Sequence, residues 1–194
     1  MTVRLELVCH ASTSATRTAA FPADEPLDDR ALRRLAVLAP DERRADRVLT
    51  SPALRARQTA EAMKLTATLD PELRDCDYGR WAGLGFDEVQ AREPEAAAEW
   101  LRDPTATPHG GESREALMRR VAVWLGEQLA TKGKVLAVTH ASVIRAAIVH
   151  AIEAEPRSFW RIDVAPLSVA RLSGHDGRWT LVSLGALDER RAAP

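Results

Sequence analysis

The stretch VRLELVCHASTSATR, residues 3–17, is the most informative part of the chain. Its first seven residues, Val3–Cys9, are largely apolar and predict a buried strand. His10 follows directly, and small and hydroxyl side chains come next. A strand that delivers a histidine into a small-residue loop is a common way to place a catalytic side chain at a sheet edge. A single histidine is more often structural than catalytic, so this stretch needs independent support.

That support comes from LAVTHASVIRA, residues 136–146, which repeats the pattern of strand, His140, small residues and helix. The carboxyl ends of parallel strands share one edge of a sheet, where ligands bind. The alternative for each histidine is a structural role at a helix entry, hydrogen-bonded to the backbone. Because His10 and His140 occupy matched settings, we favour a shared functional site.

The rest of the chain alternates between the two periodicities of strands and helices. Further strands are predicted at 47–50, 66–69 and 135–139. Helices are predicted to begin near Asp28 or Asp29 and at Ser51-Pro52, and to span 112–131 and 142–152. Residues 168–172 and 179–184 are predicted to form a hairpin around the Asp176-Gly177 turn. The order predicts an α/β fold, a three-layer α/β/α sandwich with a mixed, mostly parallel sheet. The length fits one domain, residues 1–194, with an irregular segment at about 75–111 that we interpret as a cap or active-site insertion.

Composition excludes some classes of partner. A net charge of −1 gives no reason to expect nucleic acid or an anionic membrane surface. With no apolar run of membrane-spanning length and no charged-then-apolar leader after Met1, we expect a cytoplasmic protein. Cys9 and Cys76 are the only cysteines; a reducing compartment is the simpler interpretation, with a disulfide between them as the alternative. The spacings match no metal motif, so neither metal nor cofactor is predicted.

Arg55 stands near the start of the helix predicted after Ser51-Pro52, with Ser51 as its N-cap. A cation there opposes the helix dipole at a cost of about a few tenths of a kcal/mol. An anion at the helix start would reverse this cost, because free N–H groups and a guanidinium can share a phosphate. The alternative is an ordinary solvated arginine; we favour phosphate binding.

Four segments together resemble the histidine phosphatase superfamily, the phosphoglycerate mutase-like proteins, over nearly the whole chain. They are the His140 motif VTHASVIRA (138–146), SPALRARQTAE (51–61), ELRDCDYGRWAG (72–83) and PHGGES (108–113). The resemblance implies the phosphoglycerate mutase-like fold, His10 as nucleophile and Asp75 as proton donor. It also implies that Arg55 and a protonated His140 hold the phosphoryl oxygens, with Ala141 of the same motif contributing.

The sequence departs from the family pattern at the first motif, where Arg-His-Gly reads Cys9-His10-Ala11. Losing a charged hydrogen bond of about 1.5–3 kcal/mol would remove roughly one to two decades of rate. Thr16 replaces the usual asparagine of the phosphate-binding loop. Arg17, in the same loop, is either a replacement for the lost guanidinium or a surface arginine, and the sequence favours neither.

The resemblance implies a cofactor-independent phosphatase that hydrolyses a small-molecule phosphomonoester through a phosphohistidine at His10. The alternative is a catalytically impaired phospholigand-binding or interaction protein on the same fold. A mutase is disfavoured because family mutases carry longer insertions. A cysteine phosphatase is rejected because the Cys-x5-Arg pattern would need arginine where Ala15 stands. We expect a small phosphorylated metabolite as partner, with a homodimer allowed through the edge strand of the hairpin.

Overall fold

A six-stranded sheet forms the centre of the protein, in the strand order β3-β2-β4-β1-β5-β6. The computed structural model describes residues 2–37 and 45–187. The strands are β1 (Val3–Cys9), β2 (Arg47–Thr50), β3 (Thr68–Leu69), β4 (Gly133–Thr139), β5 (Ser168–His175) and β6 (Arg178–Ala186). Neighbours from β3 to β1 pair in parallel, whereas β5 and β6 pair antiparallel. The predicted mixed, mostly parallel sheet is confirmed.

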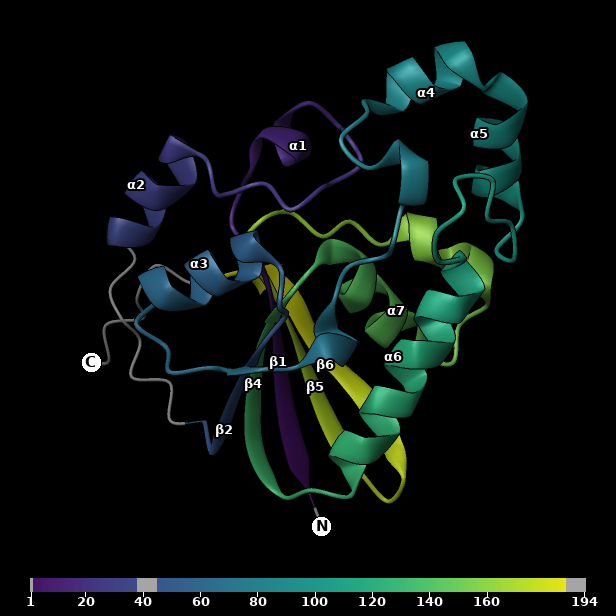
Figure 1. Cartoon of the computed structure of the whole chain (residues 1–194). Helices are drawn as coiled ribbons and strands as arrows, with labels where there is room; N and C mark the ends of the chain where they lie inside the picture. The colour runs from purple at the N-terminus through teal and green to yellow at the C-terminus, as the bar shows by residue number, and fades with distance from the viewer. Residues whose placement is uncertain (1, 38–44, 188–194) are drawn as a thin grey trace.

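Helices cover both faces of this sheet (Figure 1). Helices α6 (Arg114–Leu129) and α7 (Ala141–Ala151) pack on one face, and α2 (Asp29–Val37) and α3 (Leu54–Ala62) on the other. Strand β4 shows why both faces are covered, because its side chains alternate between two buried clusters. Val135 and Ala137 belong to the α6/α7 cluster, and Leu136 and Val138 to the α2/α3 cluster. The predicted three-layer α/β/α arrangement is therefore confirmed.

The segment 75–111 lies beyond the carboxyl end of β1 and builds a small core of its own (Figure 1). It contains the 3-10 helix Gly79–Trp81, α4 (Phe86–Arg92) and α5 (Pro94–Arg102). Two other short 3-10 helices, Pro71–Leu73 and Pro156–Arg161, lie outside this segment. Phe21 packs among Trp81 and Trp100, with centroid distances of 5.2 and 5.4 Å. This segment is thus fastened to the loop that follows His10, close to the short helix α1 (Ser14–Arg17).

The start of α3 differs from the prediction. Ser51 is not its N-cap, because the helix begins at Leu54 with Ala53 at the cap position and no side-chain cap hydrogen bond. The Ser51 amide instead donates to the carbonyl of Val138 at 2.9 Å, which continues the β2–β4 pairing by one residue. The Ser51 hydroxyl accepts a hydrogen bond from the Ala53 amide at 3.3 Å and can still donate to another partner.

Two further findings concern the cysteines and the lengths of the apolar helices. Cys9 and Cys76 are both buried free thiols, so the alternative of a disulfide between them is not realised. Within residues 2–37 and 45–187, no helix has the length and apolar character needed to span a membrane.

Candidate active site

Strand register brings the two histidines together. In the parallel β1–β4 pair, Cys9 lies opposite Thr139, and the His10 amide donates to the Thr139 carbonyl at 2.9 Å. The residues that follow are therefore His10 and His140, whose ring centroids are 5.1 Å apart. Two segments 130 positions apart in the sequence thus meet at one sheet edge because their strands are neighbours in register.

The imidazole of His10 is buried and held in one tautomer. Its Nδ1 lies 2.7 Å from the carbonyl oxygen of Ala11, which can only accept, so Nδ1 carries the proton. Nε2 is then unprotonated, and its lone pair accepts a hydrogen bond from Nε of Arg55 at 3.3 Å. Burial, and next the charge of Arg55, lower the pKa of His10 to about 4. His10 is therefore neutral at neutral pH and presents an unprotonated Nε2, as a nucleophile requires.

Arg55 is not a solvated arginine, since its side chain is almost fully buried. Besides His10, it donates from one terminal nitrogen to a carboxylate oxygen of Asp75 at 2.7 Å and from the other to the carbonyl of Ala23 at 2.7 Å. Each nitrogen of the guanidinium therefore donates a hydrogen bond, and the group lies between His10, the candidate nucleophile, and Asp75, the candidate proton donor.

Asp75 is the counter-ion of this cluster. Its carboxylate accepts from Arg55, from the hydroxyl of Ser142 and from the Cys76 amide. Burial alone would raise the pKa of Asp75, but His140, Arg55 and the Ser142 hydrogen bond together hold this pKa below its ordinary value. In the structure Asp75 is therefore ionised at neutral pH and paired with arginine, rather than poised as an acid.

His140 is fully buried and lies between a hydroxyl and a carboxylate. Its Nε2 is 2.7 Å from Oγ of Ser51, and its Nδ1 is 3.3 Å from a carboxylate oxygen of Asp75. Burial lowers the pKa of His140 to about 3 although Asp75 opposes this. The expected imidazolium is therefore replaced by a neutral ring. Ser51 is a site residue that sequence reasoning missed, because Ser-Pro was interpreted as a helix start.

The remaining predicted phosphate-binding residues divide into two groups. Thr16 and Ala141 line the same cavity as His10. The hydroxyl of Thr16 is engaged locally, because it accepts from the Thr13 amide and donates to the Thr13 carbonyl. The structure does not bring Arg17 to the site: its guanidinium pairs with Asp28 at 3.3 Å, and its side chain is 62% exposed.

Cys9 fills the position of the missing arginine with a neutral side chain. It is 2% exposed, and burial, followed by the charge of Asp75, raises the pKa of its thiol to about 12. A protonated, buried thiol is not a nucleophile, which agrees with the rejection of a cysteine phosphatase. It also offers no charge to a phosphate, so Arg55 is the guanidinium that contacts His10.

A cavity of about 220 Å³ opens beside His10 and Asp75. Aromatic side chains of segment 75–111 and of the segment after α7 form much of its wall: Tyr78, Trp100, Phe159 and Trp160. Two arginines, Arg114 and Arg145, also line it. Among the described residues no cluster of His, Cys, Asp and Glu could hold a metal ion.

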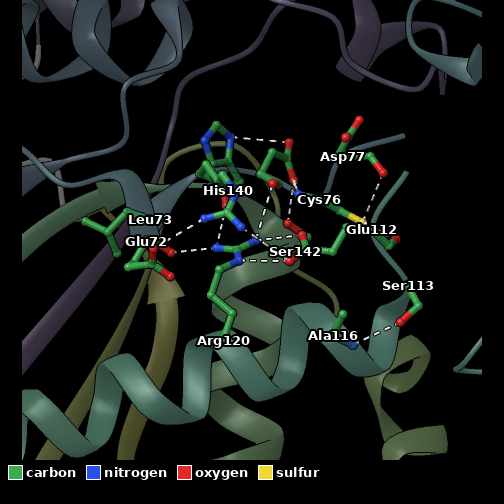
Figure 2. Close-up of polar contacts among 12 residues, drawn as sticks. Glu72, Leu73, Cys76, Asp77, Glu112, Ser113, Ala116, Arg120, His140 and Ser142 are labelled. Carbon is green, nitrogen blue, oxygen red and sulfur yellow. Dashed lines mark hydrogen bonds and ion pairs between the residues drawn. The ribbon is translucent and has the colours of Figure 1, made fainter. Parts of the chain in front are cut away.

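Arg120 of α6 contacts both Glu72 and Glu112 (Figure 2). Its guanidinium forms a double hydrogen bond with Glu112, at 2.9 and 2.7 Å. It also donates to the carbonyls of Glu72, Arg74 and Asp75, at 2.6, 3.2 and 3.4 Å. Only a cation with several directed donors can bind so many acceptors, so Arg120 fixes the segment that carries Asp75.

Comparison with known proteins places this geometry in a family. A model described as the histidine phosphatase superfamily (branch 1) matches residues 5–186. The chain belongs to the histidine phosphatase superfamily. It is 37% identical over 134 residues to a bifunctional protein of Mycobacterium tuberculosis, a match that covers 63% of this chain and 36% of that protein. The chain thus spans about a third of the length of that relative.

Two further relatives of this superfamily member match over more of their length. Phosphoserine phosphatase 1 of Hydrogenobacter thermophilus is 27% identical over 169 residues, 81% of this chain and 80% of that one. The solved structure of a mycobacterial glucosyl-3-phosphoglycerate phosphatase in complex with VO3 is 27% identical. The match covers 94% of this chain and 98% of the chain in that structure, with a TM-score of 0.82.

Proposed function

We propose that this histidine phosphatase superfamily member hydrolyses a small phosphorylated metabolite without a cofactor, through a phosphohistidine at His10. The observation that carries the proposal is the tautomer of His10. The Ala11 carbonyl accepts the hydrogen bond from Nδ1–H, so Nε2 is unprotonated, and its lone pair faces Nε of Arg55 at 3.3 Å. Relatives named as phosphatases of phosphoserine and of glucosyl-3-phosphoglycerate support a small phosphomonoester as substrate.

In the first step Nε2 of His10 attacks phosphorus, the Nε2–P bond forms, and the ester P–O bond breaks. Arg55 and the Ala141 amide at the start of α7 bind the phosphoryl oxygens, since both favour negative charge. The leaving oxygen takes a proton. In the second step water attacks phosphorus, the P–N bond breaks, and the lone pair returns to Nε2, with phosphate released.

Asp75 supplies the first proton and takes one from water in the second step. It is ionised as the partner of Arg55, so it must be protonated before it can act as an acid. A phosphate dianion that binds Arg55 draws the guanidinium from the carboxylate and brings negative charge close to Asp75 and His140. Both effects raise the pKa of Asp75 and of His140, which turns a counter-ion into an acid.

The test is hydrolysis of an aryl phosphate without added metal by the wild type and His10→Asn. The asparagine amide can keep the hydrogen bond to the Ala11 carbonyl but has no Nε2. His150→Asn, at an exposed position of α7, is the matched control. We expect turnover by the wild type and the control, none by His10→Asn, and an acid-labile phosphoryl adduct on His10 by mass spectrometry. An adduct elsewhere, or equal rates in all three proteins, contradicts the proposal.

Cys9 favours a second candidate, a phospholigand-binding protein without turnover. Its buried neutral thiol replaces a charged family residue, which weakens transition-state stabilisation more than it alters the fold. Vanadate or phosphate binding to a wild type that shows no turnover would support this candidate. Recovery of turnover in Cys9→Arg would then identify a degenerate enzyme.

A further inference from the structure

Arg114 is a buried cation that forms no ion pair with any described residue. It is the first residue of α6, only 5% exposed, and lines the same cavity as His10. One terminal nitrogen donates to the Trp100 carbonyl at 3.3 Å, and the guanidinium carbon lies 5.2 Å from the ring centroid of Trp160. Its buried Nε has no hydrogen-bond partner in the part of the chain that the structure describes.

The other deeply buried arginines of the described chain are neutralised. Arg55 pairs with Asp75 at 2.7 Å and Arg120 pairs with Glu112 at 2.7 Å. No carboxylate of the described residues lies within ion-pair distance of Arg114, although Asp103 acts on it from further away. A guanidinium keeps its charge at neutral pH, so its burial without an anion is costly. A bound anion in the cavity would remove this cost.

The position of Arg114 on its helix also favours a bound anion. α6 is 16 residues long, and a cation in its first turn faces the positive end of the dipole. Arg145, half-buried on α7, adds a second positive charge to the cavity wall, with its Nε held by the Ile162 carbonyl at 2.8 Å. Positive charge therefore gathers in a cavity that His10 and Asp75 also line.

We propose that Arg114 binds a carboxylate on the leaving group, so that the substrate is a small phosphomonoester of a carboxylic acid. The inference rests on the proposed function and names the substrate class for that same site. A planar guanidinium matches a carboxylate, and the aromatic rings around it exclude water and strengthen the pairing. A cavity of about 220 Å³ restricts the acid to a compact one.

The test compares two esters that differ only at the carboxylate, 3-phosphoglycerate and glycerol 3-phosphate. We expect wild type to prefer 3-phosphoglycerate by about 10- to 100-fold in kcat/KM, the effect of one charged hydrogen-bonded pair. Arg114→Gln should abolish this preference by lowering the 3-phosphoglycerate value alone, and Arg114→Lys should retain part of it. Arg119→Gln, an exposed arginine of the same helix, is the control and should keep the full preference.

The outcomes separate this inference from the proposed function. If Arg114→Gln lowers kcat/KM equally for both esters, Arg114 only holds Trp100 and Trp160 in place, and the inference is wrong. If wild type hydrolyses an aryl phosphate but shows no preference between the two esters, the substrate class is wrong and the phosphatase proposal stands. Calorimetric binding of both esters to His10→Asn, with and without Arg114→Gln, gives the same comparison without turnover, and equal affinities would overturn the inference.

Discussion

Mild acid should destabilise the fold because His10 and His140 are buried as neutral rings. An ordinary histidine titrates near pH 6.5 in an unfolded chain, whereas burial lowers the pKa of His10 to about 4 and of His140 to about 3. Between these values the unfolded state binds more protons than the folded state. Stability is therefore full above pH 6.5 and falls as the pH falls toward 4.

The magnitude follows from linkage. Between pH 7 and pH 5 each histidine should remove about 2 kcal/mol from the free energy of unfolding, so the pair removes about 4 kcal/mol. Carboxylates contribute little in this interval, because they are ionised in both states. The loss is a large share of the stability of a typical domain.

The assay is urea unfolding at several pH values between 5 and 7 for the wild type, His10→Asn and the exposed control His150→Asn. His10→Asn should lose about half of the histidine-dependent decrease, roughly 2 kcal/mol between pH 7 and pH 5. The control should match the wild type in slope. His109, whose pKa burial also lowers, is present in all three proteins and cancels from the comparison. A slope that is unchanged by His10→Asn would refute the argument that this ring is held neutral by burial.

Three other changes test the support of the site. Ser51→Ala should leave Nε2 of His140 without its 2.7 Å partner and lower turnover of an aryl phosphate about tenfold. A variant that unfolds more easily but keeps the wild-type turnover would contradict this role. Arg120→Met should lower the free energy of unfolding by about 1–3 kcal/mol, since it leaves the half-buried Glu112 carboxylate with only the Arg74 guanidinium at 3.8 Å, and thermal melts that match the wild type would exclude this. Gly111→Ala should destabilise the cap, because a Cβ there would stand 2.1 Å from a backbone oxygen, and unaltered proteolysis of the cap would argue against it.

Most of the scaffold follows from local patterns. The strand Val3–Cys9 and the strand Arg47–Thr50 have the predicted bounds, because alternating or continuous apolar runs define them without tertiary help. The Asp176-Gly177 turn joins β5 and β6 as predicted, with φ of 48° and 77°, values that Asp and Gly tolerate. The start of α3 was wrong because the backbone of Ser51 is held in the sheet by Val138, a contact that no local pattern contains.

The candidate site was predictable where its residues follow strand ends or begin helices. His10 and His140 meet because parallel strands share an edge, and Arg55 enters because its helix starts at that edge. Side-chain partners were not predictable in this way. From the sequence, Arg17 could reach either the site or the surface, and in the structure it is exposed and pairs with Asp28, the residue before α2.

The sequence by itself determined the sheet edge, the two histidines and the arginine of the second motif, since periodicity and motif order act over a few neighbouring residues. Only the tertiary structure decided how charge is distributed among them. It pairs Asp75 with Arg55, keeps both imidazoles neutral and leaves Arg114 without a carboxylate among the described residues. The physical reason is that ion pairing and desolvation depend on which distant segments the packed strands and helices bring within a few ångströms of each other.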